Sequence, residues 1–79
     1  MEQQVISTEL NNGEINAVIS LVCVNSQEII VRVEKTNGDG IPVWLRERHY
    51  SSPNEGTLRD YLDLVYGYEN KGYKVVKPN

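Results

Sequence analysis

Apolar and polar side chains alternate from Gln3 to Tyr50, in segments that short polar turns separate. A period of two is typical of extended strands, because successive side chains point to opposite faces of a sheet. The pattern predicts four strands, over residues 3–10, 15–24, 28–35 and 41–50. Asn12 and Gly13 tolerate the positive φ angles of a tight hairpin turn, and the glycine-rich residues 36–40 predict a second turn.

The second predicted strand has apolar side chains on both faces, which is typical of a strand in the middle of a sheet. One face carries Ile15, Ala17, Ile19, Leu21 and Cys23, and the other carries Val18, Val22 and Val24. In the third strand the two faces carry Ile29, Val31 and Val33 and, opposite them, Ile30, Arg32 and Glu34. Pro42 lacks an amide hydrogen and therefore fits the start of a strand or a sheet edge.

After Tyr50 the apolar period changes to that of a helix. Ser52, Pro53 and Glu55 match a capping box with proline at the first helical position. An amphipathic stripe then predicts the core face of one helix, and it consists of Leu58, Tyr61, Leu62, Val65 and Tyr66. Gly72 fits a left-handed C-cap, and residues 73–77 predict a short closing strand.

These elements predict a single compact α+β domain over residues 1–79, with the order β-β-β-β-α-β. We expect a mostly antiparallel β-meander of four strands, followed by one helix packed on one sheet face and a short closing strand. Two placements stay open for the closing strand, beside the first strand or beside the fourth. One helix covers only one face, so the apolar side chains of the other face need another cover or a partner.

The charge balance makes the chain acidic, because 8 Lys+Arg stand against 11 Asp+Glu for a net charge of -3. Phosphate repels such a chain overall, so nucleic-acid binding would need a local basic patch. Cys23 is the only cysteine, which predicts a buried free thiol and a cytoplasmic protein. The N-terminus lacks the pattern of an export signal, and no apolar run approaches the roughly 20 residues of a membrane span. We therefore expect no membrane association.

Few side chains could carry catalysis. His49 and Glu47 would form a general base and its orienting group, but no nucleophile can be assigned beside them. Cys23 and His49 lack further ligands at metal spacing, and no phosphate-binding loop is present. Asp60 and Asp63 are typical of a solvated helix face. We expect no enzyme activity, no metal and no cofactor.

The fourth predicted strand carries two different faces. Val43, Leu45, Glu47 and His49 share one face, and Trp44, Arg46, Arg48 and Tyr50 share the other. We expect the helix to cover the face with Val43 and Leu45. The open face would then be apolar, with Val18, Val22, Val24, Ile30 and Trp44. Exposed apolar patches rimmed by charge mark interfaces, where Trp, Tyr and Arg carry much of the binding energy.

The predicted partner-binding residues are Val18, Val22, Ile30, Arg32, Trp44, Arg46, Arg48 and Tyr50. The expected function is a small protein-binding module, of the inhibitor, immunity or accessory type that phage-like mobile elements carry, with a partner of unknown identity. One alternative is binding of single-stranded nucleic acid, with aromatic rings on the bases and arginines on the phosphates. A second alternative is a homodimer without other activity. A third is that the first strand and the C-terminal tail cover the open face.

Overall fold

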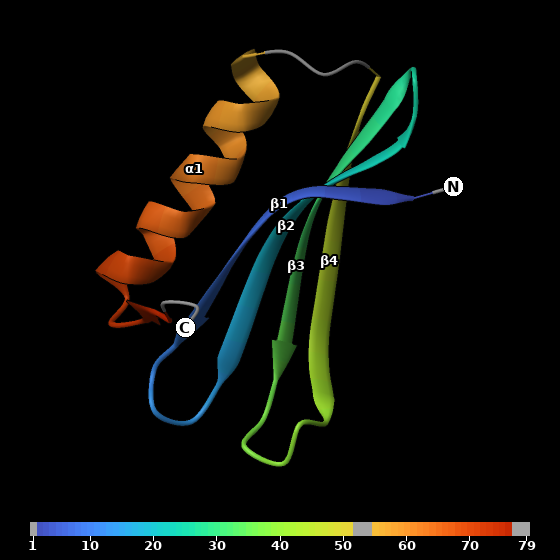
Figure 1. The fold of residues 1–79 in the computed structure, drawn as a ribbon. Coiled ribbons are helices and arrows are strands. Elements are labelled where there is room, and N and C mark those ends of the chain that lie inside the picture. The colour runs from blue at the N-terminus through green and yellow to red at the C-terminus, as the bar shows by residue number, and fades with distance from the viewer. Residues whose placement is uncertain (1, 52–54, 77–79) are drawn as a thin grey trace.

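The computed structural model describes residues 2–51 and 55–76 (Figure 1). Its elements are β1 (Gln3–Asn11), β2 (Asn16–Asn25), β3 (Glu28–Thr36), β4 (Pro42–Tyr50), α1 (Glu55–Asn70) and β5 (Lys74–Val75). They confirm the predicted α+β fold, with four antiparallel strands in a meander, one helix and a short fifth strand. The proposed cap at Ser52 and Pro53 lies outside the described residues.

All five strands form one sheet with the order β4-β3-β2-β1-β5. Each neighbouring pair is antiparallel, and β5 pairs with the end of β1 through Leu10 and Asn11. The closing strand therefore lies beside the first strand and not beside the fourth. This order leaves β4 and β5 at the two edges, with β2 near the middle as its two-sided apolar pattern predicts.

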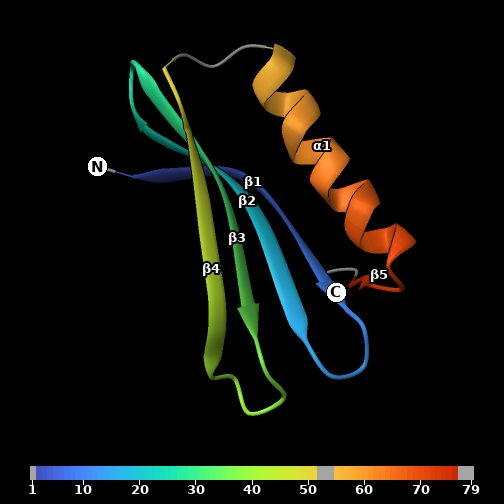
Figure 2. The ribbon, with the colours of Figure 1, turned by 180° about the vertical axis from the view of Figure 1, so that it is seen from behind.

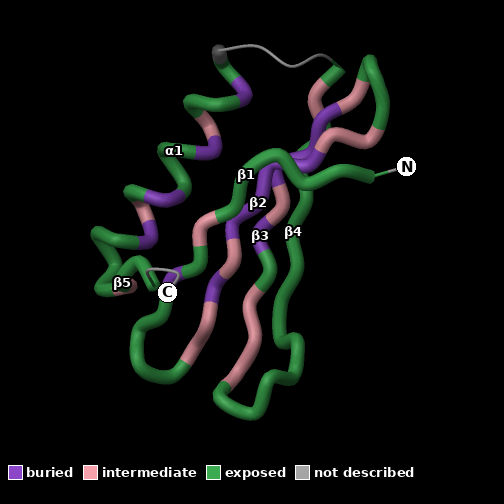
Figure 3. The backbone as a smooth tube through the Cα atoms, in the orientation of Figure 1, coloured by how far each residue is buried: buried purple, intermediate pink, exposed green. Residues whose placement is uncertain are grey.

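The helix packs mainly on β2, with further contacts to β1 and β3 (Figures 1 and 2). Between them lies the core, whose buried members are Leu10, Ile19, Leu21, Ile29, Val31, Val33, Tyr61, Val65 and Tyr68. Figure 3 shows that burial concentrates in β2, β3 and one side of α1, whereas β4 is exposed along almost its whole length.

The buried stripe of the helix differs from the predicted one. Tyr61 and Val65 are buried as expected, but Leu58, Leu62 and Tyr66 are exposed. Tyr68 takes their place in the core, and Thr57 is buried one turn before Tyr61. The helix is therefore rotated by part of a turn relative to the predicted stripe. The Tyr61 hydroxyl shares a hydrogen bond with the Thr8 hydroxyl of β1, which ties this orientation to the sheet.

The predicted assignment of β4 side chains to the two sheet faces is wrong. Val33 is paired with Arg46, and Glu34 is paired with Leu45. Opposed residues of an antiparallel pair point to the same face, so Trp44, Arg46, Arg48 and Tyr50 face the helix side, while Leu45 faces away. The cause is an irregularity between Lys35 and Thr36. A shift of one residue exchanges the two faces of a strand.

The face opposite the helix is also not the open apolar patch that the sequence pattern predicts. Val22 and Ile30 are only 3% and 4% exposed. The register of β1 shifts between Gln4 and Ile6, and the N-terminal end of the strand turns across the sheet (Figures 1 and 2). There Glu2 reaches Arg32 of β3 in an ion pair of 3.3 Å. The alternative of a face covered in part by the first strand therefore describes the molecule better.

Candidate functional site

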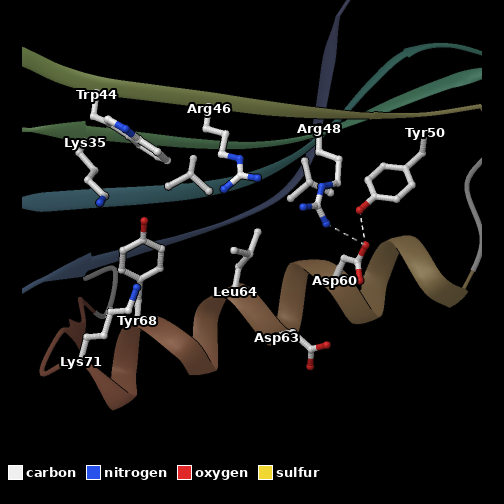
Figure 4. Close-up of a pocket in the computed structure, with 12 residues that line it drawn as sticks. Lys35, Trp44, Arg46, Arg48, Tyr50, Asp60, Asp63, Leu64, Tyr68 and Lys71 are labelled. Carbon is white, nitrogen blue, oxygen red and sulfur yellow. Dashed lines mark hydrogen bonds and ion pairs between the residues drawn. The ribbon is translucent and has the colours of Figure 1, made fainter.

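A groove of about 500 Å³ lies between the edge strand β4 and the helix α1. Because of the register of β4, its four aromatic and arginine side chains line one wall of this groove (Figure 4). They are Trp44, Arg46, Arg48 and Tyr50. Val31 and Val33 of β3, which are paired with Arg48 and Arg46, also line the groove. Leu64 and Tyr68 of α1 form the facing wall.

The groove is open because one helix is too narrow to cover the whole sheet. α1 packs on β1, β2 and β3, which leaves the strand at the far edge without a layer above it. Trp44 is 42% exposed in this position. A large aromatic ring that remains half in water beside charged groups is typical of a surface that binds a partner.

At one end of the groove a lysine lies between two aromatic rings. The Nζ atom of Lys35 is 4.5 Å from the centroid of the Trp44 ring and 5.1 Å from that of the Tyr68 ring. Lys71 approaches the Tyr68 ring to 5.2 Å from the helix side. Tyr73 packs edge-on against Tyr68 with the ring centroids 5.0 Å apart. Through Lys35, these cation–π and aromatic contacts connect Trp44 of β4 to Tyr68 of the helix.

At the other end, Asp60 of the helix connects to β4. The Tyr50 hydroxyl donates a hydrogen bond to its carboxylate, and Arg48 lies 3.8 Å from the same oxygen. Burial raises the pKa of Tyr50 above its ordinary value, and the hydrogen bond to Asp60 raises this pKa further. Tyr50 therefore stays protonated and continues to donate at neutral pH.

The middle of the groove carries positive charge that nothing nearby neutralises. Among residues 2–51 and 55–76, Arg46 forms no ion pair or hydrogen bond through its side chain. Asp63 lines the groove, but Figure 4 shows its carboxylate directed away from the strands. The cations Lys35, Arg46, Arg48 and Lys71 thus face the single inward carboxylate of Asp60. The groove is locally basic on a chain whose net charge is -3.

The structure divides the predicted partner-binding residues between two faces. Val18, Val22, Ile30 and Arg32 lie on the face away from the helix and do not line the groove. Arg32 donates a hydrogen bond of 2.6 Å to Glu47 and also contacts Glu2. The bond to Glu47 is the main cause that raises the pKa of Arg32. Arg32 is therefore already paired. Its ion pairs connect Glu2, β3 and β4 on the face away from the helix.

Several groove residues were missed by sequence reasoning. Leu64 and Tyr68 follow Asp60 at helical spacing on α1, where Tyr68 also belongs to the core, and Lys71 comes directly after the helix. That spacing was visible in the sequence, but its meaning depends on the rotation of the helix. The sequence pattern places Lys35 at the end of a strand, and only the sheet register places it against Trp44.

Of the side chains considered for catalysis, Asp60 and Asp63 line the groove, whereas His49, Glu47 and Cys23 do not. The Nδ1 atom of His49 is 2.8 Å from a carboxylate oxygen of Glu28, whereas Glu47 binds Arg32 instead of orienting the imidazole. Cys23 is partly buried, and its thiol donates to the carbonyl of Asn25. No group of three or more potential metal ligands occurs among the described residues.

No helix in the described part of the chain combines the length and the apolar character needed to cross a bilayer. Comparisons with protein-family models, with curated proteins and with solved structures found no match. The geometry of the groove is therefore what bears on function.

Proposed function

We propose that this protein is a small non-catalytic module that binds another protein through the groove between β4 and α1. It would act as an inhibitor or accessory protein of the kind that phage-like mobile elements carry. The observation that carries the proposal is the convergence of Trp44, Arg46 and Arg48 on one open wall. Tryptophan, tyrosine and arginine are the residue types that dominate the binding energy of protein interfaces.

Contacts within the protein already hold several side chains of the groove in place without a ligand. Lys35, which also contacts Tyr68, restrains Trp44, and Asp60 restrains Tyr50 and Arg48. Ordering a side chain at an interface costs about 0.5–1.5 kcal/mol, so side chains that are already held reduce the cost of association. Arg46 keeps its charge free for a ligand in the same wall.

A second candidate is binding of single-stranded nucleic acid, which the interleaving of aromatic rings and arginines on β4 favours. The details of the groove favour a protein ligand over this one. Tyr68 is only 7% exposed, and Lys35 lies against the rings of both Tyr68 and Trp44. Asp60 holds the Tyr50 hydroxyl and adds negative charge at that end. Trp44 is thus the main ring left for stacking a base.

The proposal can be tested by selecting ligands from a displayed library of protein fragments. The native chain is the bait, and the double variant Trp44→Ala, Arg46→Glu is the groove variant. The matched control is the double variant Leu58→Ala, Arg59→Glu, because it makes the same kinds of change at exposed helix positions that do not line the groove. Circular dichroism confirms that all three proteins unfold cooperatively.

Fragments that bind the native chain and the control variant, but not the groove variant, are the expected result. Fragments that bind all three proteins equally would contradict the assignment of the groove. If a labelled oligothymidylate binds the native chain, weakens with added salt and no longer binds the groove variant, while no fragment is selected, the second candidate replaces the first. Light scattering on the same samples shows whether the chain instead pairs with itself.

A further inference from the structure

The edge strand that forms one wall of the groove has a free backbone side. β4 is the last strand of the sheet and pairs only with β3 among the described residues. Eight of its nine residues are exposed, and the exception, Tyr50, is partly buried. An exposed edge of this length presents unpaired N–H and C=O groups that can accept another strand. We infer that the ligand binds as an added β-strand on β4 and that it is an acidic, extended segment of the partner protein.

The geometry of a strand added at this edge decides which side chains meet. Successive side chains of the new strand would point alternately toward the groove and away from it, about 7 Å apart on each face. Side chains directly opposite one another on paired strands have Cβ atoms about 4.5–5.5 Å apart. A ligand side chain on the groove face therefore lies within reach of Arg46 or Arg48.

The positive charge on the groove face of β4 favours a ligand with acidic side chains. Arg46 has no partner among the described residues, and Arg48 holds Asp60 only at 3.8 Å. Carboxylates on the added strand would form short charge-assisted hydrogen bonds with these guanidinium groups. Basic side chains at the same positions would be repelled, because like charges directly opposite one another destabilise a pair of strands.

The other face of the added strand meets a different surface. Leu45 points away from the groove and is 59% exposed. β-branched or other apolar side chains on the ligand would cover it and remove apolar area from water. The complementary segment thus alternates acidic residues, facing the groove, with apolar residues, facing Leu45.

A second copy of this chain fits the edge less well. Pairing β4 with another β4 would bring a second Arg46 and a second Arg48 to the same cationic face. Edge strands commonly use such charges to prevent self-pairing. An acidic partner segment instead neutralises the charge, in the recognition mode called β-strand addition. This inference rests on the proposed function, because it names the ligand class of the same groove.

The test uses synthetic peptides of about seven residues, the number that spans most of a strand of this length. In the probe peptide glutamate alternates with valine, and in the control peptide lysine replaces glutamate. Binding is followed by the fluorescence of Trp44, the only tryptophan of the chain, which lies in the groove wall. Arg46→Glu removes the free cation, and Arg59→Glu makes the same change of charge at an exposed helix position that does not line the groove.

The glutamate peptide is expected to bind and the lysine peptide not to bind. Loss of a hydrogen bond between charged groups costs about 1.5–3 kcal/mol, so Arg46→Glu should weaken binding at least about tenfold. Arg59→Glu should change the affinity much less. Equal binding of both peptides, or equal effects of the two variants, would overturn the assignment of an acidic ligand at Arg46.

Strand pairing is tested by methylating backbone nitrogens of the glutamate peptide, either on every glutamate or on every valine. In an extended peptide these two sets of amides point to opposite edges, so only one set can donate to β4. Loss of binding with one methylated peptide and retention with the other is expected. Equal behaviour of the two methylated peptides overturns strand addition, while the groove assignment still stands if Arg46→Glu weakens binding.

Failure of the inference and failure of the proposed function are distinguishable. If the glutamate peptide does not bind even at low salt, the inference is overturned, and the fragment selection described above still decides whether the groove binds a protein. If oligothymidylate displaces the peptide and binds more tightly, both the acidic ligand and the protein ligand are overturned in favour of nucleic acid.

Discussion

Substitution of Val22 by aspartate tests whether the sheet face opposite the helix is buried or exposed to solvent. The sequence pattern alone places Val22 on an exposed apolar face, where aspartate would leave a folded protein. In the structure this side chain is 3% exposed, in the central strand β2 and on the face away from the helix. Because Val22 is buried, we expect Val22→Asp to unfold the protein instead.

The magnitude follows from burial and charge. Loss of a fully buried valine side chain costs about 1.5–3 kcal/mol, and a carboxylate taken out of water costs several kcal/mol more unless it is paired. Arg32 lies on the same face, but Glu47 and Glu2 already occupy its guanidinium. A chain of 79 residues has a free energy of unfolding of about 4–12 kcal/mol. The substitution therefore removes most or all of the stability.

The assay is urea unfolding followed by far-ultraviolet circular dichroism. Leu45→Asp is the matched control, because it introduces the same group on the same sheet face at a residue that is 59% exposed. Its free energy of unfolding should change by less than about 1 kcal/mol, which includes the like charge of Glu34 opposite. Val22→Thr keeps the shape of valine and should cost about 1–3 kcal/mol for the buried hydroxyl. If Val22→Asp is folded and unfolds at the native midpoint, the burial of this sheet face is refuted.

Three further substitutions test other parts of the structure. Tyr61→Phe deletes the hydroxyl that bonds Thr8, and should lower the free energy of unfolding by about 1 kcal/mol in the same urea assay; an unchanged midpoint would contradict the bond. The raised pKa of Tyr50 stabilises the folded state below about pH 10, and this contribution is lost as the pH rises through the raised pKa. Tyr50→Phe should abolish that alkaline loss of stability. The melting temperatures of the native chain and the variant should therefore converge as the pH rises, and a constant difference between them would contradict this prediction. Gly72 has a φ of +99°, so Gly72→Ala should cost about 1–2 kcal/mol, whereas Gly38→Ala, at a position without positive φ, should be nearly neutral; equal melting temperatures would exclude the strain.

The elements of the fold could be predicted because their signals are local. The first predicted strand, over residues 3–10, is observed as Gln3–Asn11, and the fourth, over residues 41–50, is observed as Pro42–Tyr50. Periods of two and of three to four residues reflect the backbone geometry of strands and helices, which each segment carries by itself. The positive φ of Gly13 and Gly72 at the predicted turn and C-cap has the same local origin.

The groove could be predicted only in part. The sequence pattern placed Trp44, Arg46, Arg48 and Tyr50 on one face of a strand, and the structure keeps them together. The pattern also grouped them with Val22, which lies on the other side of the sheet. A period of two assigns side chains to one of two faces within a strand, but it does not show which faces of two neighbouring strands coincide.

The rotation of the helix about its axis could not be predicted from the sequence pattern either. Leu58, Leu62 and Tyr66 form as good an apolar stripe as Tyr61, Val65 and Tyr68, and the structure buries the second set. The choice depends on contacts with distant residues, such as the bond between Tyr61 and Thr8. Rotation of α1 in turn brings Leu64 and Tyr68 to the groove.

The sequence by itself determined the number, order and type of the elements, and the composition of each strand face. Only the tertiary structure decided that the arginine and aromatic face of β4 meets the helix and that the opposite face closes over Val22. The physical reason is the range of the interactions. Period, turn and cap depend on neighbours along the chain, whereas one irregularity between Lys35 and Thr36 exchanges the faces of a whole strand relative to the rest of the sheet.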